Sequence, residues 1–381
     1  MASHDRARTL TLDFAEATPR THWAFLTITT ESGITGFGEA TLAGQEAALR
    51  EAFPAIERLV RELPDTSPEM LPAGRPLSSL AEAALYSALD QALWDVAARR
   101  AGTSLTAALG GARRSQVPLY ANINRRTRDR SPEGFAASAT QACNAGFTAI
   151  KMAPFDEVTV ETIESGTAQK AADRGLARIA AVRSAIDARE LLVDCHWRFD
   201  KHSAHTVLTE CAARGVCWFE CPLPESEDNI PDIVALRASA NRHGMRLAGG
   251  EKLVRLAAFA PFIAAGAYDV MMPDIKYVGG LAEALRLAKR LQAAGIAFSP
   301  HNPSGPVAHA ASIQLCAAAP ALDRLEMQWN ESPLFEALVD PSLPTPQNGS
   351  VNVPLESPGI GVNLNRAVLL RNSPKTAASP I

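Results

Sequence analysis

Short apolar runs of strand length alternate with longer segments of helical periodicity along most of this 381-residue chain. In the longer segments, apolar residues recur every three or four positions, as on one face of a helix. The runs that predict strands are 117–123, 148–153, 190–196, 216–222, 246–251, 269–274, 296–301 and 324–329. Strands that alternate with helices pair in parallel, so eight strands with seven helical segments between them predict a closed α/β barrel.

The first 113 residues follow a different pattern. Residues 22–40 alternate apolar and polar positions, with Glu31-Ser32-Gly33 as a turn between two strands. Residues 44–62 and 78–101 have helical periodicity. This part of the chain is predicted to form a small α+β domain.

The chain is longer than one ordinary domain, and the change of pattern divides it. We predict the α+β domain over residues 1–113 and the barrel over residues 114–340. The remaining segment, from about 341 to 381, is rich in Pro, Asn and Ser. We expect it to be mostly loops that pack back on the first domain and complete it.

The composition is ordinary for a globular protein, with 47% hydrophobic and 20% charged residues. A net charge of −4 argues against nucleic-acid and membrane-surface partners. Charged residues interrupt each apolar run before it reaches a membrane-spanning length, and the N-terminus has no apolar signal core. We therefore expect a cytoplasmic protein whose six cysteines are reduced thiols.

One acidic residue or histidine ends each of six consecutive predicted strands. These residues are Asp194, Glu220, Glu251, Asp274, His301 and Glu326. They follow one another at intervals of 23 to 31 residues, about the length of one strand, one helix and two loops. In a barrel, the carboxyl ends of all strands meet at the face where active sites lie. An open doubly wound sheet is the alternative, but its site residues cluster near one switch point.

Three of these residues are carboxylates on neighbouring strands, Asp194, Glu220 and Glu251. Like charges so close together repel one another unless a cation lies between them. Oxygen ligands suit Mg²⁺ first and Mn²⁺ second, and unrelated surface acids are the alternative interpretation. Strand alternation also predicts that His196 faces the same side as Asp194.

The next two residues, Asp274 and His301, end adjacent predicted strands. A carboxylate beside a histidine fixes the imidazole tautomer and raises its basicity, which makes a general base. Glu326, on the eighth strand, could donate a hydrogen bond to a developing oxyanion if its pKa is raised, and a structural salt bridge is the alternative. Together with a cation, these groups predict proton abstraction next to a carboxylate through an enediolate.

The motifs around these residues resemble those of the enolase superfamily, in its mandelate racemase/muconate lactonizing branch. In the first domain the resemblance rests on Gly33-Ile34-Thr35-Gly36-Phe37-Gly38-Glu39, on Ala88-Leu89-Asp90-Gln91-Ala92-Leu93-Trp94-Asp95 and on Leu109-Gly110-Gly111. In the barrel it rests on Val193-Asp194-Cys195-His196, Trp218-Phe219-Glu220, Gly250-Glu251 and Pro273-Asp274-Ile275-Lys276-Tyr277-Val278-Gly279-Gly280. The resemblance covers nearly the whole chain.

The resemblance implies an α+β capping domain over a TIM-type (β/α)7β barrel. It implies Mg²⁺, with Mn²⁺ as the alternative, on the three carboxylates named above. It also implies a His301–Asp274 dyad, Glu326 as the enediolate partner, a small-molecule carboxylate substrate and a homo-oligomer, either a dimer or an octamer.

Two departures from the family pattern narrow the activity. Many members have Lys-x-Lys on the second barrel strand; here Lys151 matches the first lysine, which tends to contact the substrate carboxylate, and Ala153 stands in place of the second, basic one. A racemase that needs a base on each face of the carbon is therefore disfavoured. The Asp-x-His pattern ending in His196 is similar to the galactonate and mannonate dehydratase-like members. We therefore predict a dehydratase of a sugar acid in which His301 removes the C2 proton and His196 assists loss of the C3 hydroxyl, giving a 2-keto-3-deoxy acid.

Substrate specificity is expected to come from loops at the rim of the barrel and from the capping domain. The candidate substrate-binding residues are Thr41, Asn122, Arg125, Arg126, Trp197, Arg198 and Asn302. Arg125, Arg126 and Arg128 put three positive charges after the first barrel strand. These charges indicate a polar or anionic group at the far end of the substrate. A solvated loop is the equally ordinary interpretation.

Other functions remain open at this stage. A cycloisomerase, lactonizing enzyme or epimerase would use the same metal and base and would leave His196 idle. A carboxylate-binding or structural protein on an enzyme scaffold would not need all three acidic ligands. No phosphate-binding P-loop occurs, and the glycines at 33–38 do not match the dinucleotide fingerprint.

Overall fold

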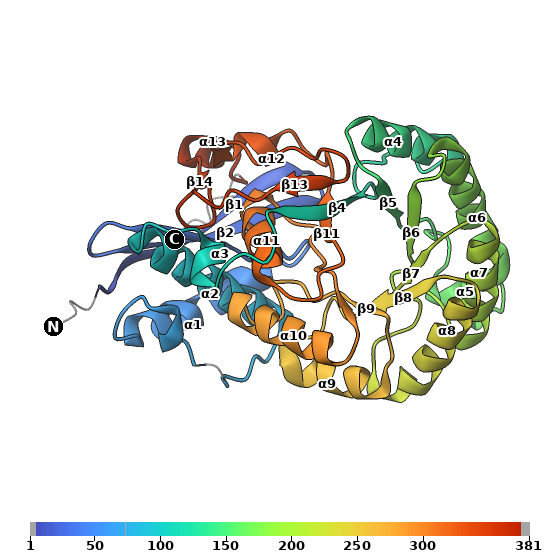
Figure 1. The fold of residues 1–381 in the computed structure, drawn as a ribbon, viewed down its shortest axis with the longest axis horizontal. Coiled ribbons are helices and arrows are strands. Elements are labelled where there is room, and N and C mark those ends of the chain that lie inside the picture. The colour runs from blue at the N-terminus through green and yellow to red at the C-terminus, as the bar shows by residue number, and fades with distance from the viewer. Residues whose placement is uncertain (1–4, 73, 375–381) are drawn as a thin grey trace, which may run out of the picture.

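The computed structural model describes residues 5–72 and 74–374. A ring of parallel strands forms the barrel, and helices surround it on the outside (Figure 1). The barrel strands are β4 (Gln116–Asn122), β5 (Ala149–Met152), β6 (Glu190–Asp194), β7 (Trp218–Glu220), β8 (Arg246–Gly249), β9 (Val270–Met271), β10 (Ala297–Phe298) and β11 (Leu325–Gln328). All eight predicted strands are therefore present.

The sheet closes on itself, which confirms the barrel over an open sheet. The strand order is β10-β9-β8-β7-β6-β5-β4-β11, so the first and last barrel strands, β4 and β11, are parallel neighbours. Between β10 and the residues just before β11, Phe298 forms a parallel bridge with Leu322. Its N–H donates to Ala321 O and its carbonyl accepts from Asp323 N, each at 2.9 Å. No barrel strand is left with an unpaired edge at this point.

Helices shield the outer face of the ring. They are α4 (Pro132–Asn144), α5 (Val160–Glu164), α6 (Ala168–Ala185), α7 (Lys201–Ala213), α8 (Ile230–Arg242), α9 (Arg255–Ala265), α10 (Leu281–Ala293) and α11 (Pro306–Ala318). Local sequence signals start several of them: the Ser131 and Asp200 side chains accept hydrogen bonds from the first turns of α4 and α7. Inside the ring, buried side chains including Tyr120, Leu192 and Trp218 fill the space between strands. The barrel is a packed core, so its chemistry is confined to the rim.

The capping domain has an antiparallel sheet of β1 (Ala7–Thr18), β2 (Thr21–Thr30) and β3 (Thr35–Glu39). The helices α1 (Glu46–Glu62), α2 (Leu80–Arg100) and α3 (Leu105–Ala108) accompany it, with a 3-10 turn, η1 (Pro68–Met70). The first strand, β1, was missed by the sequence pattern. It is an edge strand whose side chains are mostly half-buried, so its polar and apolar positions do not alternate cleanly.

Helix α2 packs closely on β3. A side chain at Gly38 would overlap the backbone of Ala88, and one at Gly36 would overlap Ala92 O. Glycine at both positions therefore allows the helix to approach the strand backbone. The same helix is almost wholly buried and reaches the barrel, where Leu281 N donates to Asp90 Oδ2 at 2.6 Å.

The C-terminal segment runs back along both parts of the chain (Figure 1). Its elements are α12 (Leu334–Ala337), β12 (Val339–Asp340), β13 (Ser350–Asn352), β14 (Asn363–Leu364) and α13 (Arg366–Arg371). Strand β13 pairs with β4, whereas Glu16 N in the cap donates to Asn372 O at 2.9 Å. The boundaries at residues 113 and 340 remain predictions, and residues 375–381 of the predicted segment lie outside the described chain. None of the helices in the described ranges has the length and apolar content needed to cross a membrane.

Candidate active site

The predicted catalytic and metal-binding residues lie on barrel strands or in the loops that follow the carboxyl ends of these strands. Asp194 and Glu220 are the last residues of β6 and β7, where they are register partners. Glu326 lies within β11, and Lys151 lies within β5. All four are at most 4% exposed, so the site is drawn deep into the barrel mouth.

All eight predicted strands extend past the last residue of the observed strand, and in three of them this places one of the six predicted strand-end residues outside the sheet. Glu251, Asp274 and His301 lie beyond the last residues of β8, β9 and β10. Prolines at 273 and 300 precede two of them, and proline has no N–H for a strand ladder. These three side chains are therefore carried by loops rather than by the sheet.

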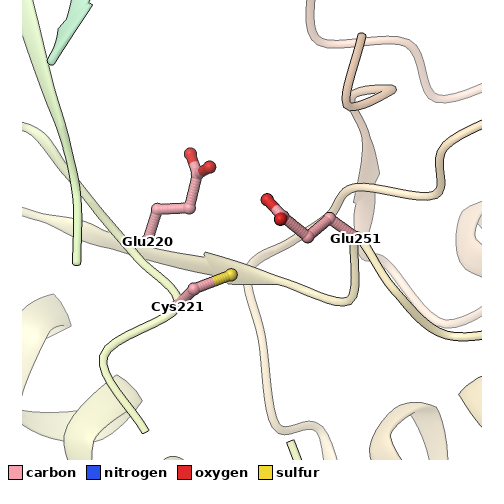
Figure 2. Close-up of side chains that lie close together, drawn as sticks. All are labelled: Glu220, Cys221 and Glu251. Atoms are coloured by element: carbon pink, nitrogen blue, oxygen red, sulfur yellow. The ribbon is translucent and has the colours of Figure 1, made fainter. Parts of the chain in front are cut away.

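Glu220 and Glu251 point into the same space (Figure 2). Within residues 5–72 and 74–374, Glu220, Cys221 and Glu251 form the one group of potential ligands whose atoms all lie within 4.8 Å of one another. Burial, together with repulsion from Asp194 and Glu220, raises the pKa of Glu251 well above its ordinary value. One oxygen of Glu251, Oε2, is buried without a hydrogen-bond partner among the described residues. Two crowded carboxylates, one of them with an oxygen that has no hydrogen bond, have the donor chemistry of a hard cation site.

Cys221 is a correction to the predicted strand faces. Alternation put it on the side opposite Glu220, but its φ of 45° takes the backbone out of the strand and brings the thiol toward the acids. Burial raises the pKa of this thiol well above its ordinary value, so it stays protonated. A protonated thiol is a poor ligand for Mg²⁺.

Asp194 is outside this group, and its carboxylate contacts His196. The Asp194 Oδ2 to His196 Nε2 distance is 2.7 Å, and the His196 backbone N–H donates to Asp194 Oδ1 at 2.8 Å. Although burial opposes it, this contact lowers the pKa of Asp194 to about 2. The carboxylate is therefore ionised and needs only to exchange its histidine contact to serve as a ligand.

His196 reaches Asp194 from a turn and not along the strand. Strand β6 ends at Asp194, and both His196 and Trp197 have positive φ values, of 50° and 55°. His196 lies beside Asp194, but it does so through this turn and not through the strand alternation that was offered as the cause. The imidazole is 39% exposed and borders a cavity of about 490 Å³, so a substrate can reach it.

Lys151 lies between two acids at the centre of the site. Its Nζ is 2.6 Å from Glu220 Oε1 and 3.1 Å from Glu326 Oε1. Burial alone would lower the pKa of this ammonium, but the two carboxylates raise it well above its ordinary value. Lys151 therefore keeps its positive charge and cannot act as a base.

Glu326 differs from the expected neutral donor. It accepts hydrogen bonds from Asn122 Nδ2 at 2.6 Å and from Asn302 N at 2.9 Å. Burial raises its pKa, but Lys151, His301 and these donors outweigh burial, so the net shift is downward. In this arrangement Glu326 is ionised and paired with Lys151, which corresponds to the salt-bridge alternative.

The predicted dyad is assembled. His301 Nδ1 lies 2.9 Å from Asp274 Oδ2, and His301 Nε2 lies 3.3 Å from Glu251 Oε2. Burial lowers the pKa of the imidazole, and Glu326 and Asp274 oppose this without reversing it. The ring is neutral near pH 7 and can accept a proton.

A residue that the sequence reasoning left out supports Asp274. Lys276 Nζ contacts both carboxylate oxygens, at 2.9 and 2.7 Å, and its backbone N–H donates to Oδ1 at 2.8 Å. Burial opposes ionisation, but Lys276 and His301 lower the pKa of Asp274. The signal was available two residues downstream in Pro273-Asp274-Ile275-Lys276.

Four of the seven candidate substrate-binding residues make hydrogen bonds to other protein groups. Asn122 and Asn302 both donate to Glu326, and Thr41 Oγ1 donates to Glu39 Oε1 at 2.7 Å. Arg126 packs its guanidinium 4.6 Å from the ring centre of Trp329 and donates to Gln141 Oε1 at 2.7 Å. Each of the four has a polar group with a protein partner, although Asn302 Oδ1 and Arg126 Nη1 are buried without a hydrogen bond among the described residues.

The other three lie at the rim. Arg198 donates to the carbonyls of Asp156 and Val158, at 3.2 and 2.7 Å, and so fixes a loop. Trp197 lies under Lys252, whose Nζ is 3.9 Å from the ring centre. Arg125 lines a separate cavity of about 690 Å³, whereas Trp197 and Arg198 line the cavity beside His196.

Two family profiles match the chain. The enolase C-terminal domain-like profile covers residues 134–368, and the mandelate racemase/muconate lactonizing enzyme N-terminal domain profile covers residues 7–110. This chain belongs to the mandelate racemase/muconate lactonizing enzyme branch of the enolase superfamily. The family membership confirms the predicted capped barrel.

Similar relatives have dehydratase names. A D-gluconate dehydratase from Thermoproteus tenax is 32% identical over 305 residues, which cover 80% of this chain and only 59% of that relative. A D-galactonate dehydratase from Verminephrobacter eiseniae (strain EF01-2) is 28% identical over 363 residues, 92% of this chain and 91% of the relative. These similarities indicate an enzyme of the carbon–oxygen lyase class, a hydro-lyase.

A solved structure supports the same fold. The mandelate racemase/muconate lactonizing enzyme from Jannaschia sp. CCS1 superposes with a TM-score of 0.84 and 25% identity. The superposition covers 97% of this chain and 98% of that one. The agreement extends through both the cap and the barrel.

Proposed function

We propose that this protein is a Mg²⁺-dependent dehydratase of a sugar acid that yields a 2-keto-3-deoxy acid. The observation that carries the proposal is the placement of two imidazoles against the acidic residues, the half-exposed His196 and the largely buried His301. His301 approaches Glu251 from the loop after β10, and His196 approaches Asp194 from the turn after β6. Strands β7 and β8 lie between β6 and β10 in the barrel. Glu220 ends β7, and Glu251 lies in the loop after β8. The dehydratase names of the relatives support the same activity.

Asp194, Glu220 and Glu251 would hold the cation. The crowded carboxylates of Glu220 and Glu251 fit a hard ion, since Glu251 Oε2 is buried without a hydrogen bond and has only the His301 Nε2 contact at 3.3 Å. When bound, Mg²⁺ supplies positive charge that stabilises the substrate carboxylate as its neighbouring C–H loses a proton. Lys151 keeps its charge in the same place and adds to that stabilisation.

The two histidines would move the protons. Neutral His301, oriented by Asp274, takes the C2 proton of the acid, and the electrons pass into an enediolate. The enediolate re-forms the carboxylate as the C3–OH bond breaks, and His196 gives a proton to the departing hydroxyl, which leaves as water. The remaining enol ketonises to the 2-keto-3-deoxy acid. Ala153, buried at the position of the second family lysine, offers no base on the other face of C2.

The decisive experiment is a screen of purified protein with Mg²⁺ against a library of mono- and dicarboxylic sugar acids. Products are detected with semicarbazide, which reacts with 2-keto-3-deoxy acids. We expect at least one acid to be dehydrated, and the His301→Asn variant to lose that activity. If no acid gives product but C2 protons exchange with D₂O, the dehydratase proposal is wrong and an isomerase is indicated.

A further inference from the structure

Glu225 lies in the loop after β7 and takes no part in the proposed reaction. Its Oε1 accepts hydrogen bonds from the backbone N–H of Gly250 and from the Tyr268 hydroxyl, the latter at 3.1 Å. The Cys221 thiol donates to the same oxygen at 3.8 Å. Burial raises the pKa of Glu225, and hydrogen bonds from these groups and from the Trp197 side chain oppose that rise. One carboxyl group therefore has donors from several segments of the chain.

These donors belong to the loops that carry the proposed ligands. Gly250 directly precedes Glu251, and Cys221 directly follows Glu220. Trp197 lies in the turn after β6, and the last residue of β6 is the third proposed ligand. The Glu220 and Glu251 carboxylates point into one space, with the Cys221 thiol beside them (Figure 2). The Glu225 side chain thus contacts all three loops from outside that ligand group.

The backbone after β8 leaves room for this carboxyl group. A side chain at Gly249 would lie 2.6 Å from Glu225 Oε1 and 2.7 Å from the Tyr268 ring, which is too close for any residue but glycine. Gly250 has a φ of 93°, a conformation that glycine adopts readily. Its hydrogen bond to Glu225 orients the peptide unit between the two glycines, one residue before Glu251.

Glu251 has few other contacts that fix its position. It lies beyond the last residue of β8, and its Oε2 has no hydrogen bond among the described residues and a single contact with His301 Nε2, at 3.3 Å. Its carboxylate is repelled by Asp194 and Glu220. Before a cation binds, this repulsion favours movement of the side chain away from Glu220. A fixed backbone at Gly250 opposes that movement.

We propose that Glu225 is a positioning residue for the cation site, which holds Glu251 opposite Glu220 by accepting the hydrogen bond of Gly250. This role rests on the proposed function, because the cation is part of it. The role requires a hydrogen-bond acceptor and not a negative charge, since the donor is a neutral N–H. Glutamine, which keeps a carbonyl oxygen at the same reach, should therefore replace Glu225, whereas leucine, which has no acceptor, should not.

Calorimetric titration of the full chain with Mg²⁺ and with Mn²⁺ tests the role without a substrate. We expect Glu225→Leu to weaken the binding of both ions about 10–100-fold, the usual result of removing a group that orients a metal ligand. Glu225→Gln should bind both ions with close to the wild-type affinity. If Glu225→Gln is as weak as Glu225→Leu, the effect follows the charge and the proposal is wrong.

Asp269→Leu is the matched control at the other end of β8. Asp269 also accepts a backbone hydrogen bond from this strand, from Leu247 N at 2.9 Å, and it pairs with Arg237 at 2.7 Å. The variant should melt at a lower temperature in EDTA and keep the Mg²⁺ affinity of the wild type. If it loses as much affinity as Glu225→Leu, general damage to β8 explains both results and the proposal is overturned.

This proposal and the proposed function can fail separately. If the wild type and Glu225→Leu bind the ions equally well, the positioning role is wrong and the dehydratase proposal stands. If the wild type binds neither ion, the proposed function fails, and crystal structures of the wild type and Glu225→Leu then test the positioning alone. A Glu251 carboxylate displaced from Glu220 in the variant would support the role, and an unmoved loop would overturn it.

Discussion

The carboxylate of Glu39, at the end of cap strand β3, accepts a hydrogen bond from the backbone N–H of Gly305 at 2.7 Å. Its other oxygen accepts from Ala308 N at 2.9 Å, within the first turn of barrel helix α11. Gly305 is the N-cap residue of that helix and follows His301 by four positions. A buried acid from the cap therefore accepts hydrogen bonds from two backbone N–H groups at the start of α11, the helix that follows the loop with His301. The helix dipole favours negative charge at this end.

We predict that Glu39→Gln lowers both stability and activity. The glutamine amide presents N–H groups to backbone N–H groups, so at least one buried donor loses its acceptor. The expected cost is about 1–3 kcal/mol in the free energy of unfolding, measured by urea denaturation. The kcat should fall as well, because the loop that carries His301 is less well held. Glu51→Gln, on the exposed face of α1, is the control, and equal stability of Glu39→Gln and Glu51→Gln would contradict this account.

A second buried acid from the cap makes stability depend on pH. Burial raises the pKa of Asp90 from 3.8 to about 7, against the opposing hydrogen bond from Leu281 N. Between about pH 4 and pH 7 the unfolded chain has released this proton while the folded chain keeps it. The contribution of Asp90 to stability therefore falls as pH rises through this window, by at most about 1.4 kcal/mol per pH unit.

Asp90→Asn should remove that slope, because asparagine can accept the Leu281 hydrogen bond but does not titrate. Urea denaturation of wild type and variant from pH 4.5 to 7.5 gives the difference in slope. The exposed Asp228→Asn variant controls for general charge effects. Parallel curves for wild type and Asp90→Asn would show that Asp90 has an ordinary pKa in the folded chain.

Metal binding should stabilise the protein, with Glu251 as a ligand and Cys221 not a ligand. At one hundred times the dissociation constant, Mg²⁺ should add about 2.7 kcal/mol to the free energy of unfolding. Cys221→Ser should keep this increment, since the thiol stays protonated and is a poor ligand for a hard ion. Glu251→Gln should lose it, although the metal-free variant gains stability from losing a crowded buried charge.

Thermal melts with EDTA and then with added Mg²⁺ measure these increments. A response that survives in Glu251→Gln and disappears in Cys221→Ser would reverse the assignment of the ligands.

Substitution of His196 and substitution of His301 should affect different steps of the reaction. His196→Asn should still exchange the C2 proton of a substrate with D₂O, since His301 and its Asp274 partner are intact. Its rate of water loss should drop by about 10²–10⁴, the usual contribution of a general acid. His301→Asn should lose both exchange and elimination.

Proton NMR follows the exchange, and the semicarbazide assay follows the elimination. The exposed His243→Asn variant serves as the control. Undiminished elimination by His196→Asn would show that His196 is not the general acid, and C2 exchange without elimination in the wild type would favour the cycloisomerase or epimerase alternative.

Local pattern was enough to predict the barrel and the order of its site residues. Eight apolar strand runs that alternate with helical segments are typical of a closed α/β barrel. In such a barrel the carboxyl ends of the parallel strands all lie at one face. For that reason Asp274 and His301, 27 positions apart, could be expected to meet, and their nitrogen and oxygen lie 2.9 Å apart. The cap was predicted less completely, because its edge strand β1 is half exposed and has little pattern to detect.

Only the tertiary structure decided how the charged groups pair. Strand alternation cannot show that the chain turns at His196 and Cys221 with positive φ, because that conformation depends on contacts with neighbouring loops. The ionised state of Glu326 depends on Lys151 from a strand far away in sequence, and the orientation of Gly250 depends on Glu225 from a neighbouring loop. Periodicity along the chain determines which way a segment faces, whereas pKa values and ion pairs depend on distances between segments that only folding sets.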